Sequence, residues 1–182
     1  MQIITGRYRA RKLLAVDSSE TRPTLARVKE SVFNLIFDKI DGSVVLDLFA
    51  GSGAYGAECI SRGAGEVFFV DQTEKAIKTI KSNTQKMTEK FEILKLPYSD
   101  ALSSFEKRNL KFDLVFLDPP YDSDFAIRSL ELLKEKNLLN LEATIVVEHK
   151  LANDLQNLPE CYIIKKSKKY GIAYVDILEY KE

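Results

Sequence analysis

The sequence has few of the residue types that build metal centres and disulfide frameworks. Its 182 residues include no tryptophan, one histidine (His149) and two cysteines (Cys59 and Cys161). No Cys/His cluster has the spacing of a zinc site, so we expect no bound metal. A disulfide between the two cysteines is one interpretation, but two buried thiols in a reducing cytoplasm fit better. For His149 we expect a structural or edge-of-site role rather than a catalytic one.

Long apolar runs and an excess of one charge are also missing. No stretch approaches the roughly 20 apolar residues of a membrane span. Residues 1–7 lack the apolar core and the cleavage site of a signal peptide. We therefore expect a cytoplasmic protein without membrane contact, folded as one domain over residues 1–182 and monomeric. The formal net charge is zero, which by itself argues weakly against a nucleic-acid partner.

The distribution of charge favours a polyanionic partner more than the total does. Residues 1–29 hold seven cationic and two acidic side chains, a local charge of +5, which leaves −5 for the remainder. We interpret residues 2–16 as a β-hairpin or a short strand and arm. Arg7, Arg9 and Arg11 share one face if this segment is extended, and Lys12 follows them. Residues 1–20 are thus a candidate RNA-binding arm, with a merely solvated strand face as the alternative.

Beyond the arm, apolar runs and helical patterns alternate. A first helix is expected over residues 24–40. Buried strands are expected at 44–50, 66–71, 91–96, 112–117 and 143–148, with helices to about 62 and over 73–87, 101–108, 125–136 and 152–157. A final hairpin is expected from 161–168 and 173–180. Strands that alternate with helices predict an α/β, doubly wound parallel sheet, here with one late antiparallel strand.

A glycine-rich turn joins the first predicted strand to the next helix. Gly51, Gly53 and Gly56 match the dinucleotide fingerprint, and Asp71 stands twenty residues after Gly51, at the end of the next strand. Asp71 is placed to accept hydrogen bonds from ribose hydroxyls. The fingerprint alone is weak, since any adenosine cofactor needs a close backbone approach and a ribose acceptor.

Two further acids narrow the choice of cofactor. Asp47 lies four residues before Gly51, and we expect it at the mouth of the turn. A carboxylate there opposes a pyrophosphate and suits a cation such as S-adenosylmethionine. Asp100, after the third strand, is placed to accept a bond from the adenine amino group. Each acid alone fits a helix cap or a solvated loop equally well, but three at successive strand ends favour a cofactor site.

The fourth strand ends in the motif Asp118-Pro119-Pro120-Tyr121. The prolines remove two backbone donors and stiffen the turn, so no sheet ladder continues through them. The Asp118 carboxylate and the Pro119 carbonyl can both accept hydrogen bonds from an amino group on a planar base, and Tyr121 can stack on that base. A plain turn after a strand is the alternative. We therefore predict methyl transfer to a planar amine.

These motifs carry a family resemblance. The segments 3–13 (IITGRYRARKL), 21–34 (TRPTLARVKESVFN), 45–56 (VLDLFAGSGAYG), 116–121 (FLDPPY) and 147–150 (VEHK) together resemble the small-subunit ribosomal RNA guanine-N2 methyltransferase family (RsmD). The resemblance implies a Rossmann-like, class I methyltransferase with a seven-stranded, mostly parallel sheet. It also implies S-adenosyl-L-methionine as cofactor, guanine N2 in 16S ribosomal RNA as target, and the assembling small subunit as partner.

The resemblance also carries residue roles. Phe49 and Ala50 join Asp47, Gly51 and Gly53 in the cofactor motif. Thr21 and Arg22 are implied near the methionine end of the cofactor. Tyr55 stands where the family usually has leucine, and the sequence does not explain this difference.

Several alternatives remain open at this point. The amine-holding residues act on an NH₂ group, which adenine, cytosine and guanine all carry. A DNA adenine-N6 methyltransferase can use the same four residues, although the chain has little room for a target-recognition domain. A protein-glutamine methyltransferase meets the same chemical problem, but the basic arm favours RNA. A dinucleotide-binding protein and an RNA-binding protein without catalysis are alternatives from other classes.

Overall fold

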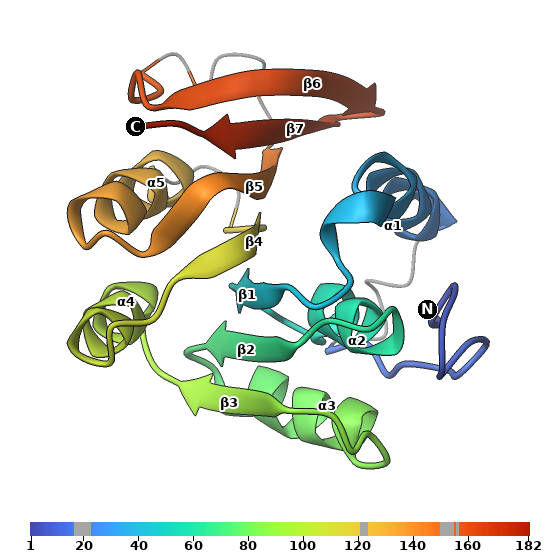
Figure 1. Cartoon of the computed structure of the whole chain (residues 1–182). Coiled ribbons are helices and arrows are strands. Elements are labelled where there is room, and N and C mark those ends of the chain that lie inside the picture. The colour runs from blue at the N-terminus through green and yellow to red at the C-terminus, as the bar shows by residue number, and fades with distance from the viewer. Residues whose placement is uncertain (17–22, 121–123, 150–154, 156) are drawn as a thin grey trace.

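The computed structural model describes residues 1–16, 23–120, 124–149, 155 and 157–182, and it is an α/β structure (Figure 1). The helices are α1 (Pro23–Leu35), a 3₁₀ turn η1 (Phe37–Lys39), α2 (Ala54–Ser61), α3 (Glu74–Thr84), α4 (Tyr98–Lys107) and α5 (Phe125–Glu135). The strands are β1 (Val44–Leu48), β2 (Glu66–Asp71), β3 (Phe91–Lys95), β4 (Phe112–Leu117), β5 (Leu139–His149), β6 (Tyr162–Tyr170) and β7 (Ala173–Tyr180).

The strands form one seven-stranded sheet in the order β3-β2-β1-β4-β5-β7-β6. The first five strands are parallel, and β7 runs antiparallel to both β5 and β6. The expected sheet with its C-terminal antiparallel hairpin is therefore confirmed. The chain reverses its strand order between β1 and β4, and ligands of such sheets bind at the carboxyl ends of the strands beside this reversal.

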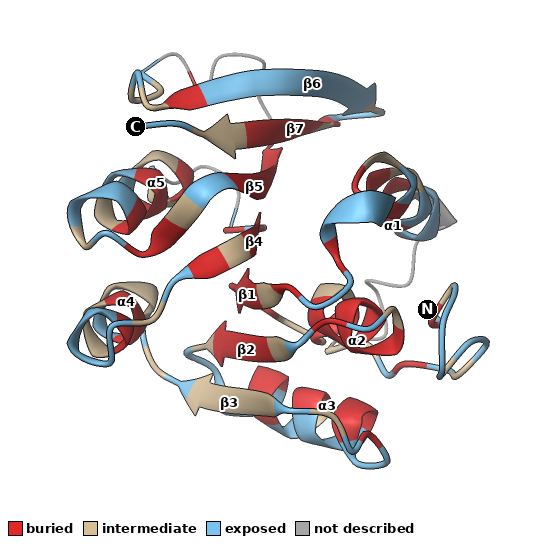
Figure 2. Cartoon of the chain, in the orientation of Figure 1, coloured by how far each residue is buried: buried red, intermediate tan, exposed pale blue. Residues whose placement is uncertain are grey.

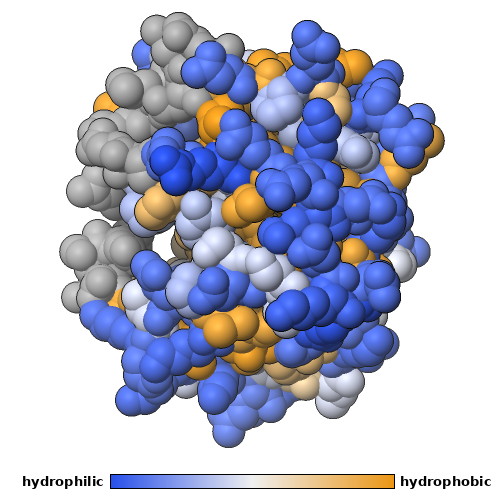
Figure 3. Space-filling model, turned by 90° about the vertical axis from the view of Figure 1, so that its left-hand side faces the viewer, coloured by the Kyte–Doolittle hydropathy of each residue, from blue (hydrophilic) through white to orange (hydrophobic). Residues whose placement is uncertain are grey.

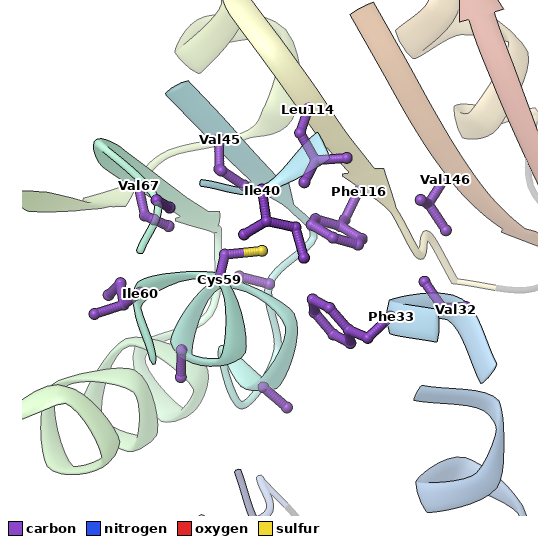
Figure 4. Close-up of a cluster of buried hydrophobic side chains, with 14 of the residues drawn as sticks. Val32, Phe33, Ile40, Val45, Cys59, Ile60, Val67, Leu114, Phe116 and Val146 are labelled. Atoms are coloured by element: carbon purple, nitrogen blue, oxygen red, sulfur yellow. The ribbon is translucent and has the colours of Figure 1, made fainter. Parts of the chain in front are cut away.

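Helices cover both faces of the sheet and enclose two hydrophobic cores. In Figure 1, α1, α2 and α3 lie on one side, and α4 and α5 lie on the other. Figure 4 shows the first core, where Phe33 and Cys59 from the helices meet Val45, Phe116 and Val146 from the strands. Successive side chains of a strand point to opposite faces, so Leu46 and Leu117 belong to the second core, with α4 and α5. Figure 2 shows the central strands buried on both faces, as parallel strands require.

Several boundaries differ from the expected ones. The first helix ends at Leu35, and a separate 3₁₀ turn follows, so it is not continuous to residue 40. Helix α4 begins at Tyr98, three residues early. Strand β5 begins at Leu139, because Leu139 pairs with Phe112 before a register shift. The helix expected at 152–157 falls largely outside the described residues.

The N-terminal segment is a folded-back arm rather than an extended strand. A single antiparallel bridge joins Gln2 to Lys12, and residues 5–10 between them form bends and turns. The premise that Arg7, Arg9 and Arg11 share the face of an extended segment is therefore wrong. Gly6 has a φ of 88°, and a Cβ added there would lie 1.7 Å from the Ser61 carbonyl oxygen. Only glycine lets the arm approach α2 this closely.

Glu58, in α2, attaches this arm to the body. The Glu58 side chain is fully buried and accepts hydrogen bonds from the backbone N–H of Ile4 (2.8 Å) and of Thr5 (3.0 Å). It also forms ion pairs with Lys29 of α1 (3.0 Å) and with Arg62 (2.8 Å). Lys29 is itself only 2% exposed, and its ammonium donates to the Gln2 carbonyl at 3.3 Å. One carboxylate thus joins the arm, α1 and α2.

Both cysteines are free thiols, Cys59 buried and Cys161 half-buried. The preference for thiols over a disulfide is therefore confirmed, although only one of the two is fully buried. Burial raises the pKa of the Cys59 thiol. Figure 3 views the side of α4 and α5, which is mostly hydrophilic with apolar side chains in small groups. Within the described ranges, no helix combines the length and apolar character needed to cross a membrane.

Candidate active site

Strand β4 ends at Leu117, immediately before the Asp-Pro-Pro motif, as the missing proline donors predict. Pro119 is buried, whereas Asp118 and Pro120 are exposed. The fourth residue of the motif, Tyr121, lies outside the described residues, so its stacking role stays a prediction. The motif stands at the carboxyl edge of the sheet, beside the reversal of strand order.

A cavity of about 1010 Å³ opens at this edge. It brings together most of the residues that the sequence analysis predicted to bind the cofactor or to hold the target amine. Its lining includes Phe49, Ala50, Gly51, Asp71, Asp118, Pro119 and Pro120 from those predictions, and also Met1, Ala15, Lys29, Tyr55, Pro97, Tyr98, Phe125, Glu148 and Tyr170–Ala173. The glycine turn and the Asp-Pro-Pro motif therefore share one cavity, although the motif begins 67 residues after Gly51.

The turn after β1 has a backbone that few side chains tolerate. Gly51 and Gly53 have φ values of 53° and 71°, and Phe49 has a φ of 66°. Gly53 lies at the amino end of α2, immediately before its first residue. A Cβ on Gly56 would lie 2.2 Å from the Phe69 ring, so this glycine lets α2 pack closely against β2. Gly53 and Gly56 thus shape the turn, while Gly51 lines the cavity.

Asp71 ends β2 beside the turn, with its carboxylate held in place. One carboxylate oxygen accepts from the Gly51 N–H at 3.0 Å, and the other accepts from the Thr73 N–H (2.8 Å) and hydroxyl (2.9 Å). A carboxylate can accept about four hydrogen bonds, so at least one site remains for a ligand hydroxyl. The ribose role predicted for Asp71 is compatible with this geometry.

The structure places Asp47 beneath the turn instead of at its mouth, which corrects the expected position. The residue is 3% exposed, and one carboxylate oxygen accepts from the Gly56 N–H at 2.9 Å, in the first turn of α2. Burial raises the pKa of Asp47 to about 7; the Gly56 hydrogen bond opposes this rise, and the charge of Asp71 adds to it. Asp47 is therefore a buried support for α2 that carries its negative charge only part of the time near neutral pH.

This raised pKa predicts a pH-dependent effect of Asp47→Asn. The folded protein keeps the Asp47 proton up to about pH 7, whereas the unfolded chain loses it near pH 4. Stability from this group therefore falls as the pH rises between these values, and asparagine shows no such loss. We expect the free energy of unfolding of the variant to rise relative to that of the wild type by about 1 kcal/mol per pH unit between pH 5 and 7. Urea unfolding at several pH values measures this difference. A constant difference would contradict the assignment, and the exposed Asp38→Asn serves as control.

Among the described residues, Asp100 is a predicted cofactor residue that does not line the cavity. Asp100 is exposed in the first turn of α4 and is not part of the lining described above, because the helix begins earlier than expected. Thr21 and Arg22 lie outside the described residues, so their predicted roles are untested.

Three aromatic side chains, which we call the aromatic wall, line the cavity near the start of α4, where a hydrogen-bond acceptor for adenine was expected. The ring centroids of Phe49, Tyr98 and Phe125 lie 5.2–6.1 Å apart, and the Phe49 and Phe125 rings are nearly parallel. Phe49 was predicted from the turn motif, whereas Tyr98 and Phe125 were missed. Tyr98 directly follows Pro97 after β3, which is the signal that could have identified it.

Sequence reasoning also missed Tyr55 and Glu148 on the other side of the cavity. The Tyr55 ring packs against Phe116 (4.8 Å between centroids) and against Phe33 (5.9 Å). Its hydroxyl faces Glu148, which is 4% exposed and whose charge acts on it. Burial raises the pKa of Tyr55, and the charges of Glu148 and Asp118 raise it further. The departure from the usual leucine at position 55 therefore adds a hydroxyl beside the Asp-Pro-Pro motif.

His149, next to Glu148, is directed elsewhere. Its ring is buried, lies 2.9 Å from an Asp176 carboxylate oxygen and stacks on Tyr174. Burial alone would raise the pKa of Asp176, but the bond to His149 lowers it. This pairing joins β5 to β7, which fits the structural role expected for the histidine.

Two basic segments, the N-terminal arm and β6, adjoin elements that line the cavity. Arg7, Arg9 and Lys12 are exposed and Arg11 is half-buried; Arg7 pairs with Glu89 at 3.1 Å. Met1 and Ala15, at the two ends of the arm, line the cavity, as does the turn from Tyr170 to Ala173. That turn follows β6, whose exposed side chains include Lys165, Lys166, Lys168 and Lys169. Only the ends of the arm reach the cavity, because the Arg7 N–H donates to the Ser61 carbonyl at the carboxyl end of α2, whereas Ala54 at its amino end lines the cavity.

Comparisons with known proteins agree with this geometry. The chain is 37% identical to "Ribosomal RNA small subunit methyltransferase D" of Haemophilus influenzae, over 95% of this chain and 90% of the relative. It is 33% identical to the protein of the same name in Escherichia coli K12, over 96% and 87%. The solved structure of the E. coli yhhF protein superposes with a TM-score of 0.87 at 26% identity, covering 100% of this chain and 98% of that one.

The expected methyltransferase fold and the family resemblance are thus confirmed. A family model described as "Conserved hypothetical protein 95" matches residues 1–179. The chain therefore belongs to the Conserved hypothetical protein 95 family, together with the ribosomal RNA small subunit methyltransferase D proteins.

Proposed function

We propose that this protein transfers a methyl group from S-adenosylmethionine to the exocyclic N2 amine of a guanine in small-subunit ribosomal RNA. The observation that carries the proposal is the single cavity shared by the glycine turn, Asp71 and the Asp118-Pro119 pair. The residues that we expect to bind the cofactor line one part of this cavity, and the two groups that we expect to accept hydrogen bonds from the amine line another part. The cofactor and the target base can therefore meet inside it.

The cofactor part of the cavity fits an adenosine that carries no phosphate. Asp71 offers a fixed ribose acceptor, and the aromatic wall of Phe49, Tyr98 and Phe125 offers an apolar surface for a planar base. The Asp71 carboxylate beside the turn makes the surroundings unfavourable for a pyrophosphate, and Asp47 beneath the turn adds to this effect only in its charged form. S-adenosylmethionine supplies, when bound, a methyl group on a cationic sulfur.

The amine part of the cavity raises the reactivity of a weak nucleophile. The lone pair of an exocyclic amine is delocalised into the ring, so the nitrogen must become pyramidal to react. The Asp118 carboxylate and the Pro119 carbonyl, held on a stiff turn, accept the two N–H bonds and favour this form. A bound S-adenosylmethionine would supply the methyl group to this nitrogen, and Asp118 would take the proton that the nitrogen then loses and pass it to water. Positioning of the two reactants supplies much of the acceleration.

Ribosomal RNA is the target that the relatives' names support. Both relatives above are named as ribosomal RNA small subunit methyltransferases, and the basic segments at the cavity suit a polyanion. The adenine-N6 alternative on DNA has no such support. We further propose that the protein acts as a cytoplasmic monomer on the assembling small subunit, with residues 1–20 as its RNA-binding arm.

Calorimetry tests the cofactor assignment directly. We expect S-adenosylmethionine and S-adenosylhomocysteine to bind and NAD not to bind, because the site has a ribose acceptor and the Asp71 carboxylate beside the turn opposes a pyrophosphate. Asp71→Ala should weaken binding by about tenfold, the effect of one charge-assisted hydrogen bond. Binding of NAD in place of S-adenosylmethionine would refute the proposal.

The RNA-binding arm predicts a change in salt dependence. We expect replacement of Arg7, Arg9 and Arg11 by glutamine to weaken RNA binding. The slope of log K against log salt should fall by about 0.7–0.9 for each phosphate that these side chains no longer neutralise. The measurement is a filter-binding titration at several salt concentrations.

The matched control is a variant in which Lys107, Lys111 and Lys134, on the opposite side of the sheet, are all replaced by glutamine. These side chains are exposed on or beside α4 and α5. The control should leave the slope unchanged. If the two triple variants change the slope equally, the arm does not bind RNA.

A further inference from the structure

Glu148 is a buried carboxylate inside the cavity, beside the amine-holding motif. Strands β4 and β5 are parallel with Leu117 paired to Val147, so Asp118 and Glu148 directly follow paired residues at the same edge of the sheet. Both side chains line the cavity, yet Glu148 is only 4% exposed. A carboxylate is rarely buried without a specific purpose, since removal from water disfavours its charged form.

Tyr55 fixes where the Glu148 carboxylate lies. Val146, two residues before Glu148 on the same face of β5, belongs to the core shared with Phe33 and Phe116. The Glu148 side chain is thus on the face of Tyr55, and its charge raises the pKa of the Tyr55 hydroxyl. The charge of Asp118 also raises the pKa of this hydroxyl, as expected from the register that places Asp118 and Glu148 side by side. The Tyr55 ring, packed between Phe33 and Phe116, has little freedom to move away.

The bases differ in the atom beside their exocyclic amine. In guanine, the N2 amine adjoins N1–H, a hydrogen-bond donor. In adenine and cytosine, the amine adjoins a ring nitrogen that carries a lone pair and accepts. A carboxylate at this place attracts the donor and repels the lone pair. Asp118 and Pro119 can accept hydrogen bonds from the amine of any of the three bases. Selection of one base therefore needs a further group that contacts the ring atom beside the amine.

We propose that Glu148 selects guanine by accepting its N1–H while Asp118 and Pro119 hold the N2 amine. Tyr55 is the positioning residue, since its closely packed ring and its hydroxyl border the Glu148 carboxylate. This inference rests on the proposed function and names its specificity determinant. The Asp-Pro-Pro motif alone does not distinguish guanine from adenine, whereas an acceptor for N1–H does.

The test compares guanine with 2-aminopurine at the mapped target nucleotide in small-subunit RNA assembled with a synthetic segment. 2-Aminopurine keeps the amine at C2 but has an unprotonated N1. For the wild type we expect kcat/KM to be about 10- to 100-fold lower with 2-aminopurine than with guanine. Glu148→Gln can donate from its amide to the unprotonated N1. We therefore expect this variant to lose activity on guanine, to gain it on 2-aminopurine, and to shift the ratio by at least about tenfold.

Two further measurements keep the result interpretable. Calorimetry with S-adenosylhomocysteine reports whether Glu148→Gln still folds around its cofactor, independently of turnover. Tyr55→Phe should shift the guanine to 2-aminopurine ratio in the same direction but by less, because it leaves the carboxylate in place.

The failures of the two proposals are distinguishable. If Glu148→Gln lowers both rates and leaves the ratio unchanged within about twofold, Glu148 only supports Tyr55 and the inference is overturned while the proposed function stands. If the wild-type product is not N2-methylguanosine, the proposed function fails and this inference fails with it.

Discussion

Replacement of Asp118 by alanine is expected to abolish methyl transfer while the protein still binds S-adenosylmethionine. The variant removes the carboxylate acceptor of the amine and leaves only the Pro119 carbonyl. Loss of one positioned hydrogen-bonding group for a developing charge typically lowers the rate by about 100- to 1000-fold. Cofactor affinity should change little, because Gly51 lies in the turn after β1 and Asp71 ends β2, so neither belongs to β4 or its motif. The measurement is single-turnover methylation with excess enzyme, beside calorimetry of cofactor binding.

Two further variants define the role of Asp118. Asp118→Asn keeps one acceptor oxygen and should retain more activity than Asp118→Ala. Asp124→Ala is the matched control, since this exposed aspartate follows the same motif and pairs only locally, with Arg128. Turnover of Asp118→Ala at the rate of the control would contradict the assigned role.

Replacement of Glu58 by alanine is expected to destabilise the protein by about 3–5 kcal/mol, the range for one partner removed from a buried ion pair. The reason is the ammonium of Lys29, which stays 2% exposed and loses its carboxylate. The N–H groups of Ile4 and Thr5 lose their acceptor as well. Urea unfolding measures the change. The arm should also become more accessible to protease, because Glu58 attaches it to α2.

The effect of Glu58 should depend on pH. Burial alone would raise the pKa of Glu58, but the charge of Lys29 and the Ile4 N–H hold it below its ordinary value. A carboxyl with a lowered pKa contributes stability above its ordinary pKa and loses it as the pH falls through the folded value. The difference between wild type and Glu58→Ala should therefore shrink in acid.

Glu74→Ala is the control for Glu58→Ala, because Glu74 forms a similar ion pair, with Lys95 at 2.7 Å, on the surface. Exposed pairs contribute little, so this variant should unfold at nearly the wild-type urea concentration. Equal destabilisation by both variants would show that burial of the Glu58 group is not the cause.

Much of the fold was readable from the sequence because parallel strands are long apolar runs separated by helical patterns. The carboxyl ends of such strands meet at one edge, so Gly51, Asp71 and Asp118 could be grouped without coordinates. The side to which Asp47 points was not readable. A strand buried on both faces has no alternation of polar and apolar residues to mark its faces.

The missed residues depend on contacts between distant segments. Glu148 meets the motif only because β5 pairs with β4 in a register that brings residue 147 opposite residue 117. Tyr55 is joined to Glu148 by the packing of α2 on that face of the sheet. The condition that the arm is extended failed because its positive-φ residues, Gly6 and Ala10, fold it back onto α2. Local pattern carries none of this information, which is set by tertiary packing.

The central claim is tested most directly by mass mapping of the methylated nucleoside. Small ribosomal particles, naked small-subunit RNA and DNA are offered in parallel to the purified protein with labelled S-adenosylmethionine. We expect N2-methylguanosine in the ribosomal RNA and no label in DNA. N6-methyladenine in DNA, or a methylated base other than guanine in the RNA, would contradict the proposed function.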